Sequence, residues 1–572
     1  MSFIRPVEKI GSDCVTSQDV LDPTTKQSED THNLPPAAPK GYLDSCISSE
    51  VTLGLGSGDP GAEDITSRTE STLGSSQYEM TQQLAHISLT PTRNRLSSSI
   101  FCLPDDMLFE IFSHVIYAPE NQNLPMKECL QRSYSSLHNL MAVCSDWKHF
   151  AVNQGEFWKI IPACDWCIKY LAIDLSIQRA GNRGLRLATI LSRHITAPRL
   201  SAIIESHASR FCALNVQSED LDYIHNLVRQ LSQVDAQLSE LSIWYTYYMD
   251  TEGQCTSPPI YAEALDQAPF ARLIRSLSVL RLWGCLGRWE TITFSDRLVE
   301  LFIHRVRLVN SGSAMESFLS AISSANELRD LTIIDLQACY NWTETTGLLA
   351  RPKIVLPKLR SLVLQDLWFN VLELVLLVLA PGTYHSALKL TWVVVHIGHS
   401  FKLSTWEKIE PSNVITLLSR VTIDRLWLLG VTAEKPWLNG TEVRRLLTAV
   451  PRLKEFGLHN WIFQLNFFNQ LLATSASDDG RGELEFPRLE GLGLTRAFVT
   501  DEEGFKRFLA KMRAQKVIFG GITESKVKSG FWHRLQGDED IVGWLRCNIP
   551  GFCFVDCEHV PAPMRVGEWR LW

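Results

Sequence analysis

Cysteine and histidine side chains occur in two groupings whose spacing could hold a metal ion or carry out redox chemistry. Cys164 and Cys167 have the Cys-x-x-Cys spacing of zinc and thiol-disulfide sites, and Cys553, Cys557 and His559 lie close together near the end of the sequence. A structural zinc site usually needs four ligands, and no second Cys-x-x-Cys pair follows the first. We therefore predict no metal site and no cofactor, and interpret these thiols as small buried packing residues.

Motifs of the common enzyme classes are missing from the sequence. It has no nucleophile elbow, no Gly-rich loop followed by Lys and Ser or Thr, and no His-Glu-x-x-His. His304 and His459 stand in expected strands without a partnered nucleophile, and Glu502 and Glu503 stand at an expected helix start, where carboxylates complement the helix dipole. We predict no catalytic residues, so the chain is not expected to be an enzyme.

Length and charge limit the remaining functions. At 572 residues the chain is too long for one compact core, so several domains or an elongated repeat array are expected. A net charge of -8 gives no basic surface for nucleic acid. The longest apolar stretch, Val371 to Ala380, is well short of the roughly 18 residues that a membrane span needs. With no signal-peptide pattern at the start, we expect a cytoplasmic or nuclear protein that binds neither nucleic acid nor membrane.

The first 97 residues differ in composition from the rest. They are rich in Ser and Thr, their only aromatic residues are Phe3, Tyr42 and Tyr78, and all 17 Trp lie at or after Trp147. Such a segment cannot bury enough apolar surface to offset the entropy lost on ordering. We predict a disordered tail over residues 1–97.

A short helical module is expected over residues 98–165. After Pro104, which suits a first helical turn, apolar residues recur every four positions in two rows, Met107/Ile111/Val115 and Leu108/Phe112/Ile116. A polar insertion of roughly residues 118–133 is expected to precede a second helix with its own apolar stripe, Leu137, Leu140, Cys144, Trp147 and Phe150. Two such helices cannot hide both apolar faces, which implies a partner.

The order Leu-Pro, Ile-Phe, Val-Cys, Trp and Phe-Trp in this module resembles the F-box, particularly the fungal kind. The resemblance implies docking on a Skp-type linker protein and, through it, on a cullin of a ubiquitin ligase. The residues that it assigns to the docking surface are Leu103, Pro104, Ile111, Phe112, Val143, Cys144 and Trp147. The chain departs from the pattern in the long insertion and in Asp146, where a basic residue is common. The alternative is a helical cap that meets no linker protein.

Leu-x-x-Leu-x-Leu motifs recur through residues 166–530 at spacings typical of a leucine-rich solenoid. The expected strands contain Leu238/Leu241/Ile243, Leu277/Leu280/Leu282, Leu298/Leu301/Ile303, Leu328/Leu331/Ile333, Leu359/Leu362/Leu364, Leu388/Leu390, Ile423/Leu426/Leu428, Leu453/Phe456/Leu458 and Leu489/Leu492/Leu494. Helical stripes lie between them, and one is expected to begin with a capping box at Thr500 and Glu503. The fold class expected is α/β, an irregular strand-helix solenoid with a capping segment over residues 531–572. A compact α/β enzyme is the alternative fold.

Alternation along each strand sends the residues beside the leucines to the opposite, concave face. A protein substrate is expected to bind there, at residues of aromatic and basic character, namely Trp244, Arg281, Trp283, Phe302, His304 and Trp427. The alternative is that these rings are covered by the insertion around residues 251–268 or by the terminal segment.

The function expected from these patterns is that of a substrate-recognition adaptor of a Skp-cullin-F-box ubiquitin ligase. The alternative is a freestanding leucine-rich protein-binding scaffold without a link to ubiquitination.

Overall fold

The computed structural model describes residues 103–119, 121, 124–164, 171–191, 197–233, 238–246, 267–285, 289–308, 311–338, 353–398, 406–430, 436–464, 466–473, 486–512, 514–524, 532–537, 539–561 and 569–572. The predicted tail, residues 1–97, and Cys167 lie outside them. The chain divides into two compact units, Glu8–Phe109 and Met1–Val7 with Glu110–Trp572. Only residues 103–109 of the first unit are described, and they include the start of the helix Asp105–Ile116, which continues into the second unit.

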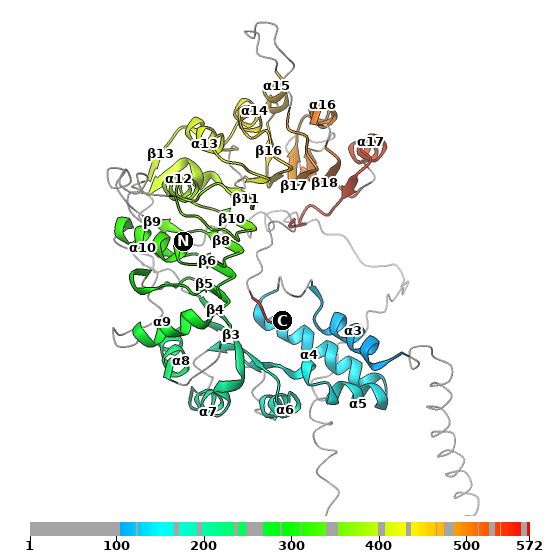
Figure 1. Cartoon of the computed structure of the whole chain (residues 1–572). Helices are drawn as coiled ribbons and strands as arrows, with labels where there is room; N and C mark the ends of the chain where they lie inside the picture. Colours follow the sequence, from blue (N-terminus) through cyan, green and yellow to red (C-terminus); the bar gives the residue numbers. More distant parts are fainter. Residues whose placement is uncertain are drawn as a thin grey trace, which may run out of the picture. The chain divides into compact units, whose positions relative to one another are not determined.

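Helices alternate with strands along the described chain (Figure 1). The helices are α3 (Asp105–Ile116), α4 (Met126–Val143), α5 (Ser145–Asn153), α6 (Leu171–Arg179), α7 (Ala197–His207), α8 (Leu221–Gln233), α9 (Gln267–Ser276), α10 (Ser311–Ser323), α12 (Phe369–Val378), α13 (Pro411–Leu418), α14 (Gly440–Ala449), α15 (Phe467–Leu472), α16 (Glu502–Met512) and α17 (Asp540–Asn548). Short 3-10 helices are η4 (Gly155–Trp158), η6 (Ala208–Arg210), η8 (Trp289–Thr291) and η9 (Trp392–Val395).

The strands form one large sheet and two small ones. The large sheet has 16 strands, β1 (Ile160–Ala163), β2 (Leu185–Leu191), β3 (Phe211–Ser218), β4 (Glu240–Tyr245), β5 (Val279–Trp283), β6 (Glu300–His304), β8 (Asp330–Ile334), β10 (Ser361–Gln365), β11 (His385–Leu390), β14 (Arg425–Leu429), β15 (Glu455–His459), β16 (Ile462–Phe463), β17 (Gly491–Val499), β18 (Lys516–Glu524), β19 (Trp532–Arg534) and β20 (Phe552–Phe554). The small sheets pair β7 (Arg307–Leu308) with β9 (Gln337–Ala338) and β12 (His396–Gly398) with β13 (Trp406–Lys408).

The predicted leucine motifs are the strands of a parallel ladder, and they pair in register. Leu241, Leu280, Leu301, Leu331 and Leu362 stand opposite one another across β4, β5, β6, β8 and β10, and each is at most 1% exposed. Figure 1 shows the helices gathered on one side of this curved sheet, so the leucines are buried between strand and helix. The chain is therefore an α/β strand-helix solenoid preceded by a short helical module, as predicted.

The ladder changes register at β11, which explains why the motif there is weak. Leu388 of β11 pairs with Leu364, the last leucine of the β10 motif, and with Leu426, the middle leucine of the β14 motif. Ser386 of β11 pairs with Leu362 of β10. The register therefore advances by one Leu-x-Leu step. The polar Ser386 is tolerated at a buried position because its hydroxyl donates to the Thr422 carbonyl at 2.6 Å.

Residues just beyond several strands adopt a left-handed backbone that the sequence pattern did not predict. They have φ between 47° and 54°, and the backbone N–H of each donates to a carbonyl of the next strand of the large sheet. These donor and acceptor pairs are Arg305 and Ile334, Asp335 and Gln365, Asp366 and Lys389, and Asn460 and Thr495. The hydrogen bond extends the ladder past the strand and offsets the cost, about 1–2 kcal/mol, of this conformation in a residue with a Cβ.

The helical module is organised around Phe112, which is fully buried. Its ring meets Trp147 edge-on at 4.9 Å between centroids, Phe150 at 5.4 Å and Phe157 at 6.1 Å. One residue of α3 thereby packs against both α5 and η4. Ile116, one turn later and 1% exposed, belongs to the same inner face of α3.

The observed helices and strands cross three of the predicted boundaries. The insertion expected to reach Ser133 ends earlier, because α4 begins at Met126 and buries Met126, Cys129 and Leu130. The sheet begins with β1, inside the predicted helical module, since Ile160 pairs with Arg186 of β2. It also continues into the predicted capping segment, where β19 and β20 pair with β18.

The second predicted helix and the predicted capping box are also wrong in detail. Cys144 has extended backbone and divides the expected helix into α4 and α5. At α16 the Asp501 side chain accepts the Gly504 N–H at 2.8 Å, while the Thr500 hydroxyl donates to the Phe463 carbonyl instead. A complete capping box is found at α14, between Asn439 and Glu442. No helix in the described ranges is long and apolar enough to span a membrane.

Candidate protein-binding surfaces

Helix α3 leaves one apolar row exposed. Met107, Ile111 and Val115 are spaced by four residues, so they share one face of the helix, and they are 52%, 37% and 44% exposed. Phe112 and Ile116 bury the opposite face. We call Met107, Ile111 and Val115 the α3 row.

Exposed large apolar side chains are concentrated in this module. Among the described residues, those of this kind are the α3 row, Val143 at 59%, Val355 at 63% and Val560 at 42%. Four of these six lie in α3 and α4. Single exposed apolar residues are ordinary on a protein surface, whereas a contiguous row on one helix marks a contact surface.

The residues predicted to dock a linker protein divide into exposed and structural ones. Pro104, Ile111 and Val143 are exposed, and Leu103 is partly exposed. Phe112, in contrast, lies in the core of the module and offers no surface. Any role of Phe112 in docking would be to hold α3 in place. Met107 and Val115 were absent from the predicted set, although their spacing with Ile111 was the signal that could have included them.

The other two predicted docking residues are partly buried. The Cys144 sulfur accepts the backbone N–H of Trp147 at 3.4 Å and so caps the start of α5. The Trp147 ring packs on Phe112. The docking role of these residues stays a prediction.

An aromatic stack crosses the concave face of the first repeats. Trp244, Trp283 and His304 occupy the same register position on β4, β5 and β6. The Trp244 and Trp283 rings are parallel within 10° at 3.8 Å between centroids, and the His304 ring is 3.5 Å from that of Trp283. Spacing between neighbouring strands, about 4.8 Å, permits rings at one register position to stack. Three of the predicted substrate-binding residues therefore form one surface.

The stack is kept neutral at its His304 end. Burial, followed by the positive charges of Arg305 and Lys389, lowers the pKa of His304 to about 3. The neutral imidazole near pH 7 adds aromatic surface to the stack and no charge. The Arg305 guanidinium carbon lies 5.8 Å from the Trp283 ring, at a cation–π distance.

The last four residues of the sequence lie against the other end of this stack. The Trp569 ring is 5.1 Å from that of Trp244, with 18° between the ring planes, so the terminal segment continues the stack. Trp572 contacts Tyr117, which follows α3, at 5.4 Å between centroids. Of the two alternatives for a cover on the predicted binding rings, the terminal segment is the one observed. Residues 251–266 of the other alternative lie outside the described residues.

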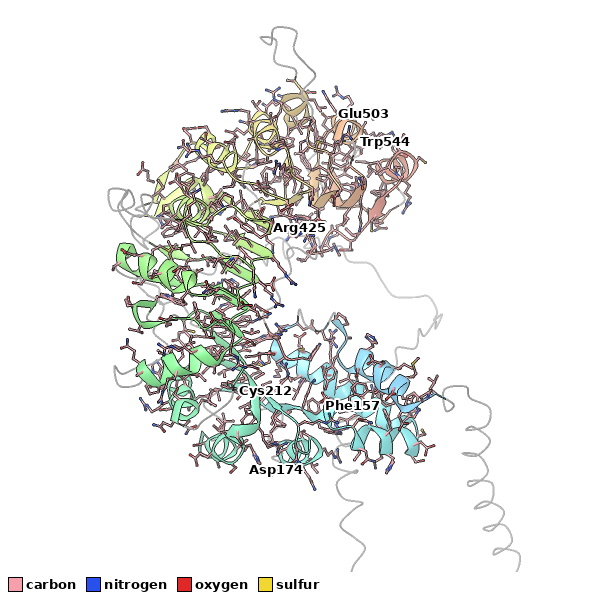
Figure 2. The ribbon with its side chains drawn as sticks, in the orientation of Figure 1. Phe157, Asp174, Cys212, Arg425, Glu503 and Trp544 are labelled. Carbon is pink, nitrogen blue, oxygen red and sulfur yellow. The ribbon has the colours of Figure 1, made fainter. Side chains whose placement is uncertain are left out.

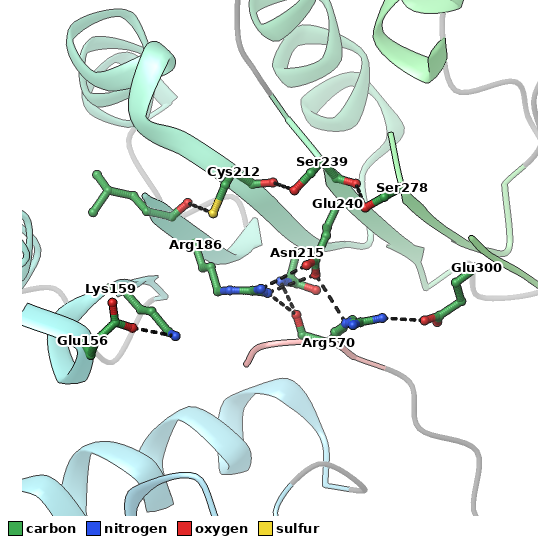
Figure 3. Close-up of polar contacts among 11 residues, drawn as sticks. Glu156, Lys159, Arg186, Cys212, Asn215, Ser239, Glu240, Ser278, Glu300 and Arg570 are labelled. Carbon is green, nitrogen blue, oxygen red and sulfur yellow. Dashed lines mark hydrogen bonds and ion pairs between the residues drawn. The ribbon is translucent and has the colours of Figure 1, made fainter. Parts of the chain in front are cut away.

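Arg570 bridges two carboxylates of the sheet (Figure 3). Its guanidinium is 2.7 Å from a Glu300 oxygen and 3.6 Å from a Glu240 oxygen. Glu240 and Glu300 begin β4 and β6 and are separated by Val279 of β5 in the register. The two acidic side chains are only 13% and 15% exposed, which strengthens the pairing compared with a surface ion pair.

The two glutamates also pair with arginines of the sheet. Arg186 forms two parallel contacts of 3.0 Å with the Glu240 carboxylate, and Arg281 donates to Glu300 at 2.6 Å. Arg281, one of the predicted substrate-binding residues, therefore positions a carboxylate. Neither glutamate was predicted, because an acidic residue at the start of a strand has no periodic signal.

The backbone of the terminal segment is recognised as well. The Arg570 carbonyl accepts hydrogen bonds from the Asn215 amide at 3.2 Å and from Arg186 at 3.5 Å (Figure 3). Asn215 is 1% exposed, on the concave side of β3. Side-chain and main-chain contacts together fix how the segment lies on the sheet.

Phe302 and Trp427 are the predicted substrate-binding residues that the structure buries, at 6% and 5% exposure. Trp427 of β14 lies over Gly457 and Gly493, where a Cβ on either glycine would overlap its ring. The missing side chains of β15 and β17 thus make the space that the indole fills. As described, neither Phe302 nor Trp427 presents a contact surface, and their substrate-binding role stays a prediction.

Beyond the stack, the concave face carries a buried charged pair. Lys389 is 3% exposed, and burial lowers its pKa to about 8, opposed by the charge of Asp366. Burial raises the pKa of Asp366 to about 6. Farther along, Arg425 lies on the side of the sheet away from the helices, whereas Glu503 stands on one of those helices (Figure 2). Arg425 pairs with Glu455 of the next strand at 3.3 Å.

Comparison with known proteins adds little to this geometry. No family model and no curated protein matches the chain. Several solved structures are similar to it, including the following two. The leucine-rich repeat-containing protein LegL7 from Legionella pneumophila is 12% identical with a TM-score of 0.27, covering 68% of this chain and 96% of its own. Rad7, in its complex with Elc1 in yeast, is 12% identical with a TM-score of 0.29, covering 86% and 98%. TM-scores this low establish neither fold nor function for this chain.

Proposed function

We propose that this chain is a substrate-recognition adaptor of a Skp-cullin-F-box type ubiquitin ligase. Helices α3 to α5 would bind a Skp-type linker protein, which ties the chain to a cullin, and the solenoid would bind the protein to be modified. In this proposal the chain is not itself an enzyme, needs no cofactor, and acts in the cytoplasm or nucleus.

The exposed α3 row is the observation that carries the proposal. Phe112 and Ile116 already form the buried side of α3, so the exposed row does not contribute to the core of the described residues. A contiguous exposed apolar row of this kind is typical of a surface that a partner covers. The F-box-like residue order at the same helix supplies the kind of partner.

The second half of the proposal depends on the solenoid. Its concave face holds aromatic rings, paired carboxylates and a main-chain recognition site, and such a mixture favours a protein segment over a small molecule. In the strand-helix arrangement each repeat contacts only its neighbours, which leaves a long surface for a partner.

Binding of a Skp-type linker tests the proposal directly. The full chain and a variant with Ile111→Asp and Val115→Asp are mixed with a purified Skp-type protein, and complex formation is measured by size-exclusion chromatography and calorimetry. We expect the unsubstituted chain to bind and the variant to lose at least about a hundredfold in affinity, since both carboxylates would be buried unpaired. Circular dichroism should be unchanged, because both positions are exposed.

Val355→Asp is the matched control, because Val355 is an exposed valine outside the helical module. It should bind the linker protein as the unsubstituted chain does. If the unsubstituted chain does not bind, or the double variant binds equally well, the chain is better explained as a freestanding protein-binding scaffold.

A further inference from the structure

The surface that holds the terminal segment has the properties of a peptide-binding site. It offers a flat indole face at Trp244, two carboxylates two strands apart at Glu240 and Glu300, and a side-chain amide at Asn215 that donates to a main-chain carbonyl. An aromatic residue followed directly by Arg satisfies all three, as Trp569 and Arg570 show. Because β5 lies between the two glutamates, one guanidinium must reach across that strand to contact both carboxylates, which restricts where the arginine can lie.

We propose that this surface is a binding site for a partner-protein segment with an aromatic residue followed by Arg, and that Trp569–Trp572 occupies it until such a segment displaces them. The inference rests on the proposed function, of which it names the class of substrate sequence. The contacts of the resident residues define the occupant: the guanidinium of Arg570 reaches both carboxylates, which also pair with Arg186 and Arg281, and the ring stack favours an aromatic neighbour.

The resident segment leaves some polar atoms of the site without hydrogen-bond partners. In the described structure the indole nitrogens of Trp569 and Trp572 are buried without a hydrogen-bond partner, as is the side-chain oxygen of Asn215. A buried polar group without a partner costs about 1–3 kcal/mol. A partner segment that supplies an acceptor near the indoles and a donor to Asn215 would gain hydrogen bonds that the resident residues do not make.

The competing explanation is a permanent structural strap. Trp569 and Leu571 are 5% and 2% exposed, and both join a core cluster with Met126 and Leu130 of α4 and Ala188 of β2. The terminal segment thus contacts the helical module and the sheet together. An incoming aromatic segment can displace the resident residues only if it makes equivalent apolar contacts with α4 and β2. Exchange of the segment tests this directly.

Exchange in the full chain decides between the two explanations. A protease cleavage site is placed within residues 562–568, the protein is folded and purified, and the chain is then cut so that the segment remains bound only by its contacts. A fluorescent peptide with the sequence of residues 566–572 is added before and after cleavage, and its anisotropy is measured. Cutting is necessary because a tethered segment competes at an effective concentration in the millimolar range.

We expect little binding before cleavage and saturable binding afterwards. Replacement of the peptide's arginine or of its first tryptophan by Ala should weaken binding at least about tenfold, and a scrambled peptide of equal composition should not compete. On the protein side, Glu300→Gln should weaken binding similarly. Glu327→Gln, which removes a surface pair with Lys358, is the matched control and should have no effect.

Failure of the peptide to exchange without denaturant would overturn the proposal in favour of a permanent strap. Equal binding of the intact, Ala-substituted and scrambled peptides would overturn it as non-specific adsorption. Because the peptide variants leave the protein unchanged, misfolding cannot produce either result. Linker binding through α3 is measured separately, so a permanent strap in a chain that binds the linker would leave the adaptor function standing.

Discussion

The indole of Trp569 lies 5.1 Å from that of Trp244, between ring centroids, and nearly parallel to it, although Trp244 lies in β4, more than 300 residues earlier in the sequence. Each of the two residues covers the other, so the aromatic stack of the first repeats is closed at one end by the terminal segment. This relationship makes the concave surface dependent on residues that are far away in the sequence.

Trp569→Ala should uncover Trp244 and destabilise the chain. Loss of a buried Trp typically costs about 3–5 kcal/mol, so the midpoint of urea unfolding should fall clearly. Acrylamide quenching of tryptophan fluorescence should rise, because the open face of Trp244 becomes accessible. Trp544→Ala in α17 is the control, since Trp544 is partly exposed and far from the stack in sequence. Unchanged quenching in the Trp569 variant would contradict the arrangement.

Much of the fold could be predicted because every repeat has the same local pattern of apolar residues, first with strand periodicity and then with helix periodicity. Leu280 and Leu282 and their counterparts recur with the period of a strand, and their neighbours recur with the period of a helix. The strands β1, β2, β3 and β18 contain no such leucine motif and were missed. The start of α4 was missed because Cys129 and Ser133 interrupt its apolar row, although both are buried.

Phe112→Ala and Ile111→Ala, at neighbouring positions of α3, should differ in their effect on the free energy of unfolding, because Phe112 lies in the core of the module and Ile111 is a proposed docking residue. Phe112 is fully buried against three aromatic rings, so its loss should lower the free energy of unfolding by about 3–5 kcal/mol. Ile111 is 37% exposed, and its loss should cost less than about 1 kcal/mol. Urea unfolding followed by circular dichroism measures both. Equal costs would mean that the α3 row is packed against protein rather than exposed.

The predicted sites show why surfaces are harder to predict than folds. Alternation correctly sent Trp244, Trp283 and His304 to one face, because that depends on strand geometry alone. It could not show that Glu240 and Glu300 would share one arginine, because that pairing joins residues from both ends of the solenoid. Exposure depends on what covers a face, and local periodicity has no information about distant segments.

Gly457→Ala should destabilise the middle of the sheet by overpacking. The added Cβ would overlap the Trp427 ring, which is 5% exposed and has little room to move. Overpacking of this kind costs about 1–3 kcal/mol. Gly543→Ala is the control, because no atom lies within 4 Å of a Cβ at that position in α17, and Ala favours a helix over Gly. Thermal unfolding should show a lower Tm for the first variant and an equal or higher Tm for the second.

Acidification should destabilise the chain through His304 and His459. Burial, followed by nearby positive charges, lowers their pKa values to about 3 and about 4, whereas an unfolded histidine titrates near pH 6.5. A lowered pKa means that the unfolded state binds more protons between the folded and unfolded values. The stability that each neutral imidazole contributes is therefore fully present above about pH 6.5 and is lost as the pH falls toward 4.

Asp366 opposes this trend over part of the range. Burial raises its pKa to about 6, so the folded state binds more protons there between pH 3.8 and 6, and acidification through that window favours folding. The two histidines together should outweigh one aspartate, because each unfolded histidine binds a proton over the same range of pH. The free energy of unfolding should accordingly fall from pH 7.5 to pH 5.

His304→Gln isolates one contribution, because glutamine keeps a polar group of similar size without a charge to gain. The decrease in the free energy of unfolding between pH 7.5 and pH 5 should be smaller in this variant by about 2 kcal/mol, the linkage expected for one such histidine. His114→Gln, at an exposed position of α3, should leave the decrease unchanged. Urea titrations at pH 7.5, 6 and 5 provide the measurement. If the His304 variant keeps the full decrease, His304 is accessible to protons in the folded chain, and the neutral end of the Trp244 stack is not formed as described.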